Sequence, residues 1–191
     1  MGKYFGTDGF RGEANVDLTA DHAFRVGRFL GWYYNIKRPA GSESAKILIG
    51  KDTRRSSYMF EYALAAGITA SGADAYLLHV TTTPSVAYVT RMDDFDCGVM
   101  ISASHNPFYD NGIKIVNSRG EKIDDAMIEM IERYIDGETE SLVEGEGLVE
   151  ILGGDGHVGV AQALDDVVGH GSFSFHVYMY TYMIADECTL V

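Results

Sequence analysis

The chain has 191 residues, a net charge of −13 and 46% hydrophobic residues, which suits one globular domain or one domain with a piece of another. The negative charge argues against nonspecific nucleic-acid binding, and no apolar run reaches the roughly 18 residues of a membrane span. Two cysteines are too few for a disulfide framework, and the first residues form no hydrophobic signal-peptide core, so we expect a cytoplasmic protein.

Strands and helices are predicted to alternate along the first 140 residues. In chain order we expect a helix from Ala20 to about Tyr34 capped by Thr19, a strand over Lys46–Ile49, a helix from about Ser57 to Ala70, a strand over Ala75–His79, a helix with Thr83 as cap and Pro84 in its first turn, a strand over Cys97–Ile101, and a helix from about Asp124 to Ile135 followed by Gly137. This alternation predicts an α/β fold with a mixed, mostly parallel sheet between helices.

The most informative stretch follows the strand that ends at Ile101. It reads Ser102-Ala103-Ser104-His105-Asn106-Pro107 and continues to Asn111-Gly112-Ile113-Lys114. Asn-Gly tolerates positive φ, so we expect these two residues to form a type I′ hairpin turn. The returning strand would then bring the Lys114 ammonium toward Ser104. A hydroxyl, an imidazole and an ammonium on one loop suit phosphoryl chemistry.

Two other segments concentrate cations and turn residues. Tyr4–Gly12 places three glycines at a spacing of three around Arg11, whose guanidinium is a rigid fork of donors for phosphate, while glycine allows a backbone to approach a ligand closely. Gly50–Ser57 follows a predicted strand, the usual place for ligands in α/β folds, and begins a helix that we expect to be serine-capped. Neither segment has the pattern of a Walker loop or a dinucleotide fingerprint.

These three segments resemble the α-D-phosphohexomutase superfamily, and most of all its phosphoglucosamine mutase branch, over residues 1–140. The resemblance implies that Ser104, and not Ser102, carries a phosphate, with His105, Lys114 and Arg11 as the other catalytic residues. It implies supporting roles for Thr7, Asp8, Gly9, Asp52, Arg54 and Asn106.

The resemblance also implies a reaction. Phosphoserine would donate its phosphoryl group to a hexosamine phosphate and recover it from the other end of a bisphosphorylated intermediate, converting glucosamine 6-phosphate to glucosamine 1-phosphate. Mg²⁺ would bind Ser104 through its phosphate, but the aspartate loop that holds the metal in this family has no counterpart here. We therefore expect the chain alone to lack turnover.

Two other functions are compatible with the sequence. Phosphomannomutase or phosphoglucomutase differs only in the sugar, which the missing downstream loops select. A non-catalytic α/β module that binds phosphate or a partner protein is the rival of a different class, with self-association through an exposed domain interface.

Residues 141–191 do not resemble the family. They contain eight glycines and no Lys or Arg, a bias that favours out-of-frame translation over a truncated second domain. Gly153–His157 lacks the carboxylate spacing of a metal loop, and the spacings of His157, His170 and His176 fit no usual metal site.

Overall fold

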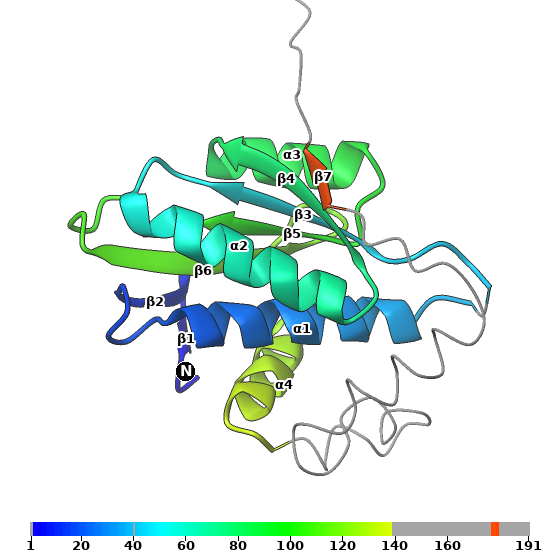
Figure 1. The fold of residues 1–191 in the computed structure, drawn as a ribbon, viewed down its shortest axis with the longest axis horizontal. Helices are drawn as coiled ribbons and strands as arrows, with labels where there is room; N and C mark the ends of the chain where they lie inside the picture. Colours follow the sequence, from blue (N-terminus) through cyan, green and yellow to red (C-terminus); the bar gives the residue numbers. More distant parts are fainter. Residues whose placement is uncertain (1, 40, 139–176, 180–191) are drawn as a thin grey trace, which may run out of the picture.

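A mixed sheet between helices organises the chain (Figure 1). The structure, a computed structural model, describes residues 2–39, 41–138 and 177–179. The strands are β1 (Phe5–Gly6), β2 (Gly9–Glu13), β3 (Lys46–Lys51), β4 (Asp74–Val80), β5 (Cys97–Ile101), β6 (Asp110–Asn117) and β7 (Val177–Met179), and the helices are α1 (Ala20–Ile36), α2 (Arg55–Ala70), α3 (Thr83–Met92) and α4 (Asp125–Ile135). The predicted α/β fold is confirmed.

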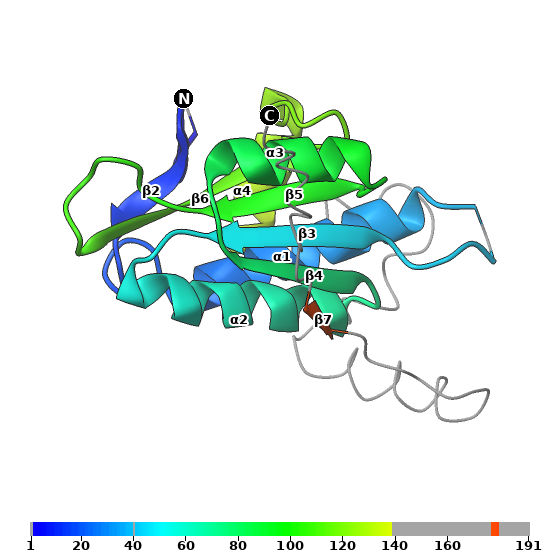
Figure 2. The ribbon, with the colours of Figure 1, turned by 90° about the horizontal axis from the view of Figure 1, so that it is seen from above.

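The sheet has parallel and antiparallel halves. Its seven strands lie in the order β1-β2-β6-β5-β3-β4-β7. Strands β5, β3 and β4 are parallel and lie side by side, with β7 parallel to β4 at the edge (Figure 2). Strand β6 runs antiparallel to both β5 and β2, and β2 is antiparallel to β1. Strand β6 therefore joins the N-terminal strands to the parallel half.

Helix ends follow capping residues. The Thr19 hydroxyl accepts the backbone N–H of His22, whose ring accepts the N–H of Thr19, so the predicted cap of α1 is a reciprocal capping box. Two predicted helix caps are wrong. Helix α3 is capped by Thr82, because its hydroxyl accepts the N–H of Ser85, and α2 begins after Arg54 with no side-chain cap.

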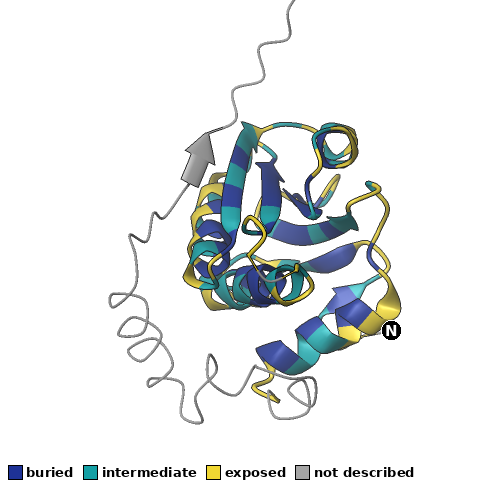
Figure 3. Ribbon diagram, turned by 90° about the vertical axis from the view of Figure 1, so that its right-hand side faces the viewer, coloured by how far each residue is buried: buried dark blue, intermediate teal, exposed yellow. Residues whose placement is uncertain are grey.

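Each face of the sheet has its own apolar cluster. Helices α1 and α2 cover one face, where Phe29 and Leu64 pack against Ile47 and α4 joins the cluster. Helix α3 covers the other face, where Val86 packs near Leu48. Figure 3 shows the buried positions gathered where the strands face the helices. Every residue of β5 is buried, as expected of a central strand covered on both faces.

The predicted type I′ turn at Asn111-Gly112 is wrong, because both residues lie inside β6. Gly112 pairs with Arg11 of β2, and the fully buried Asn111 pairs with Gly12. The chain reverses instead through residues 102–109, between β5 and β6. The antiparallel pairing of the returning strand was predicted correctly, because β6 runs antiparallel to β5. The predicted inward-facing residues Ile113 and Ile115 are both buried in the core.

Only a short part of the C-terminal segment is described. Strand β7 pairs with β4 through Ala75 and Val177, and it lies in the aromatic stretch near the end of the sequence. The segment 153–157 and residues 157, 170 and 176, for which the sequence predicts no metal site, lie outside the described residues. None of the helices in the described ranges is long and apolar enough to cross a membrane.

The core makes a first prediction on α2. Phe60 is fully buried and Tyr62 is 59% exposed on the same helix. Phe60→Ala should lower the free energy of unfolding by about 3–5 kcal/mol, because it removes buried apolar surface and leaves a cavity. Tyr62→Ala, the matched control, should change it by less than about 1 kcal/mol. Urea denaturation followed by circular dichroism measures both, and equal losses would contradict the assigned orientation of α2.

Candidate phosphoryl-transfer site

The loop after β5 presents Ser104 in a conformation that most side chains avoid. Its φ is +58°, in the left-handed region, which costs of order 1–3 kcal/mol for a residue other than glycine. The Ser104 side chain is exposed, and its backbone N–H donates to the Ser102 hydroxyl at 3.0 Å. Ser102 is only 7% exposed. Ser104 is thus exposed to solvent, whereas Ser102 is buried and its hydroxyl holds the Ser104 backbone N–H.

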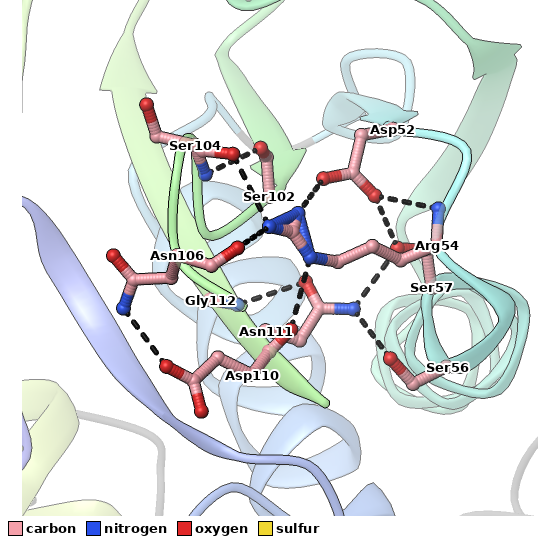
Figure 4. A network of polar contacts seen from close by, with 10 residues as sticks. All are labelled: Asp52, Arg54, Ser56, Ser57, Ser102, Ser104, Asn106, Asp110, Asn111 and Gly112. Atoms are coloured by element: carbon pink, nitrogen blue, oxygen red, sulfur yellow. Dashed lines mark hydrogen bonds and ion pairs between the residues drawn. The ribbon is translucent and has the colours of Figure 1, made fainter. Parts of the chain in front are cut away.

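Arg54 holds this loop by its main chain. Its Nη2 donates to the carbonyl oxygens of Ser104 and Asn106 at 3.1 and 2.7 Å, and its Nε donates to that of Asp110 at 3.0 Å (Figure 4). Its Nη1 pairs with the Asp52 carboxylate at 2.7 Å. The planar guanidinium thus fixes three carbonyls along the loop with one side chain. The predicted neighbourhood of Asp52, Arg54 and the serine loop is present.

Asp52 and Asn111 connect the loop to the first turn of α2. The Asp52 carboxylate accepts the N–H of Arg54 at 3.0 Å and the hydroxyl of Ser57 at 2.8 Å. The Asn111 amide donates to the hydroxyls of Ser56 and Ser57, both at 2.9 Å. Sequence reasoning missed Asn111, Ser56 and Ser57 as parts of the site. The sequence feature that could have indicated them is the serine pair directly after the charged turn. The hydroxyls of these two serines bond to the side chains of Asp52 and Asn111 instead of capping the helix.

Strand β2 brings Arg11 beside the root of the loop. Arg11 pairs with Gly112 of β6, and the carbonyl of Gly112 accepts the N–H of Ser102 at 2.9 Å. The Arg11 side chain is 22% exposed, and its Nη2 lies 3.3 Å from the Asp8 carboxylate. Its buried Nε has no hydrogen-bond partner among the described residues. A cation with an unused donor therefore lies next to the strand ends that carry the serine loop.

The remaining candidates lie around these residues. Lys114 is half-buried on β6, opposite Met100 of β5. Gly9 has a φ of +96°, and a Cβ there would lie 2.4 Å from the carbonyl oxygen of Ile113. Gly9 is therefore required by its approach to β6, a reason that differs from the expected close approach to a ligand. Thr7, Asp8 and His105 are exposed.

The described residues do not fit a complete magnesium site. Across the described ranges, no group of three or more His, Cys, Asp or Glu side chains is placed to hold a metal ion. The Asp52 carboxylate is already engaged by Arg54 and Ser57. The positive charge that these residues can offer a phosphate therefore comes from arginine and lysine side chains.

Comparison with known proteins assigns this arrangement to a family. The family described as "Phosphoglucomutase/phosphomannomutase, alpha/beta/alpha domain I" matches residues 2–142. The chain belongs to this family. The curated phosphoglucosamine mutase of Lachnospira eligens is 75% identical over 138 residues, which cover 72% of this chain and 30% of that protein. The curated phosphoglucosamine mutase of Lachnoclostridium phytofermentans is 68% identical over 138 residues, which again cover 72% of this chain and 30% of that protein.

Solved structures agree with this assignment. A phosphoglucomutase/phosphomannomutase family protein from Burkholderia thailandensis matches with a TM-score of 0.60 and 26% identity, covering 71% of this chain and 30% of that one. A putative phosphomannomutase from Thermus thermophilus matches with a TM-score of 0.60 and 29% identity, covering 69% of this chain and 29% of that one. The chain thus spans about 30% of the length of the curated relatives it matches.

Replacing Arg54 tests the hold on the loop. Arg54→Lys should lower the free energy of unfolding by about 2–4 kcal/mol, because one ammonium cannot satisfy three carbonyls and a carboxylate together. Amide hydrogen exchange over residues 102–110 should also become faster. The neighbouring Arg55 is exposed, so Arg55→Lys is the control and should leave both measurements unchanged. If the two variants behaved alike, Arg54 would not be what orders the loop.

Proposed function

We propose that this chain is the phosphoserine-bearing part of a phosphosugar mutase, with Ser104 as the phosphoryl carrier. The observation that carries the proposal is the outward-facing, left-handed Ser104, whose loop is fixed by Arg54. The names of the relatives from Lachnospira eligens and Lachnoclostridium phytofermentans support glucosamine 6-phosphate and glucosamine 1-phosphate as the sugars. The whole reaction belongs to a longer protein than the residues that match here.

The transfer step needs an exposed acceptor and fixed positive charge. In the forward half-reaction, the phosphorus–oxygen bond to Ser104 breaks as a sugar hydroxyl oxygen bonds to the same phosphorus. The hydroxyl proton leaves to a base, and the Ser104 oxygen recovers a proton when the phosphate has gone. Catalysis of such a step is mainly positioning and stabilisation of spreading negative charge.

The residues around the loop are suited to these tasks. Arg11 supplies a cation whose side chain is 22% exposed, and the exposed part of its guanidinium would bind a phosphate oxygen. Lys114, on the strand next to it, supplies a second cation. His105 or Lys114 would move the proton of the attacking hydroxyl. Asn106, Asp52 and Arg54 act on the shape of the loop rather than on the phosphate, since their polar atoms bond to the protein itself.

The runner-up is activity on mannose or glucose phosphates. The likeness to the structure from Thermus thermophilus, a putative phosphomannomutase, favours it. The higher identity of the two curated relatives favours the glucosamine phosphates.

Mass spectrometry tests the carrier. The chain purified without phosphatase treatment should carry one phosphate, about 80 Da, on Ser104. Ser104→Ala should abolish that mass, whereas Ser102→Ala should retain it. Phosphate on Ser102 alone would contradict the assignment. A mutase assay on the same chain should read at background, and Ser104-dependent turnover would contradict the expectation that the chain alone is inactive.

Lys114 is tested in a full-length relative, at the position equivalent to it. Substitution of that lysine by methionine keeps the length of the side chain and removes its charge. Turnover should fall at least about a hundredfold, the scale for loss of one positioned charge or acid–base group. The lysine equivalent to Lys122, which is exposed, provides the control. A near-normal rate in the first variant would remove Lys114 from the mechanism.

A further inference from the structure

The polar contacts beside the serine loop close into a ring. The side-chain amide of Asn111 donates to the Ser57 hydroxyl at 2.9 Å, and that hydroxyl donates to the Asp52 carboxylate at 2.8 Å (Figure 4). The same carboxylate accepts the Nη1 of Arg54 at 2.7 Å, and the Nε of Arg54 donates to the Asp110 carbonyl oxygen at 3.0 Å. Because Asp110 and Asn111 share a peptide bond, the path returns to the residue at which it began.

The hydrogen bonds of this ring run in one direction. The side-chain oxygen of Asn111 accepts the backbone N–H of Gly112 at 2.8 Å, so the NH₂ group of the amide faces the serines of α2. An NH₂ group can only donate, so the Ser57 hydroxyl accepts from it and keeps its own proton for Asp52. Asn111 and Ser57 are both fully buried, and an unmade hydrogen bond is costly in the interior. The orientation of the Asn111 amide therefore decides where the Ser57 proton points.

The ring leads to the atoms that shape the serine loop. The Nη2 of Arg54 donates to the carbonyl oxygens of Ser104 and Asn106. The guanidinium can keep this position only while the Asp52 carboxylate holds its other edge. The left-handed φ of Ser104 is unfavourable by itself, so the conformation of this serine depends on a hold that begins at the buried amide.

The first turn of α2 supplies its own internal comparison. The Ser56 hydroxyl accepts from the same Asn111 amide at the same distance as Ser57, 2.9 Å. Among the described residues, however, the Ser56 hydroxyl makes no hydrogen bond to Asp52, whereas the Ser57 hydroxyl does. Both serines satisfy the amide, but only Ser57 connects it to the carboxylate that holds Arg54.

We propose that Asn111 is a positioning residue for Ser104. Its amide keeps the Ser57 proton on Asp52, and this carboxylate in turn keeps the Arg54 guanidinium against the loop. The proposal rests on the proposed function, because it gives the left-handed Ser104 conformation a purpose in phosphoryl transfer. The conformation can be measured without phosphate on the chain, so a failure of the positioning role can be told apart from a failure of the proposed function.

Backbone NMR on the full chain, dephosphorylated beforehand, tests this role. A strong NOE between the amide and α protons of Ser104 reports its positive φ, and amide hydrogen exchange at Asn106 and Asp110 reports how firmly the loop is held. Ser57→Ala breaks the ring, so it should weaken the NOE and raise both exchange rates at least about tenfold. Ser56→Ala, the matched control, removes the other acceptor of the same amide and should leave these readouts close to wild type.

Substitution of Asn111 tests the direction of the hydrogen bonds. Asn111→Asp keeps the shape of the side chain and the oxygen that accepts from Gly112, but its carboxylate cannot donate to Ser57. It should disturb the loop as Ser57→Ala does, and the double variant should add little, because both changes break one ring. Asn35→Asp is the control, since the Asn35 amide bonds backbone groups at the C-terminal end of α2 and just before β3. This control should leave the Ser104 NOE and the loop exchange rates unchanged.

Several outcomes would overturn the positioning role. These are equal loop exchange in Ser56→Ala and Ser57→Ala, wild-type readouts in Asn111→Asp, or a loop that Asn35→Asp disturbs to the same degree. The serine pair decides the question if Asn111→Asp does not fold. Expected NMR results on a chain that never carries phosphate on Ser104 would contradict the proposed function and still support the hold of the ring on the loop.

Discussion

The candidate site depends on one charged side chain that binds backbone. A serine at positive φ costs of order 1–3 kcal/mol, and the loop that imposes it has neither helix nor strand to hold it. Hydrogen bonds to a charged donor contribute about 1.5–3 kcal/mol each, so the three from Arg54 offset that cost. Asp52 keeps the guanidinium in its orientation, and Ser57 keeps Asp52 in place. The shape of the serine loop is thus fixed from β3 and α2, before any ligand arrives.

Arg54 and Arg11, the two arginines near the loop, use their hydrogen-bond donors differently. The hydrogen-bond donors of Arg54 are used on carbonyls of the protein, so its charge stabilises structure. Arg11 retains a buried donor without a partner among the described residues, and an unsatisfied buried donor costs about 1–3 kcal/mol until something accepts from it. The rest of its guanidinium lies beside the exposed Asp8 carboxylate, with the Nη2 at 3.3 Å, so the charge of Arg11 is shared with a surface partner rather than used on the backbone of the loop.

How far the sequence could predict this structure depended on the range of each interaction. Local patterns sufficed for the strand Cys97–Ile101 and for the Thr19 cap, because apolar runs and capping act between near neighbours. Asn111 was misread as a turn residue because its burial depends on serines of α2, more than fifty positions earlier in the chain. The hydrogen bonds from the N–H groups of Tyr4 and Phe5 to Glu132 could not be predicted for the same reason, since nothing near Glu132 in the sequence marks its partners. Local propensity yields to tertiary contacts at such positions.

The position of β6 in the sheet has a consequence for how the protein is made. Strand β2 has one long-range partner strand, β6, and Phe10 pairs there with Ile113. The bond from Phe5 to Glu132 spans 127 positions. During synthesis, the N-terminal strand must therefore wait without its partners until nearly the whole of the family domain has emerged from the ribosome. Strands β3, β4 and β5 can assemble earlier, because they follow one another closely in the chain, so the first residues to be synthesised are among the last to reach their place.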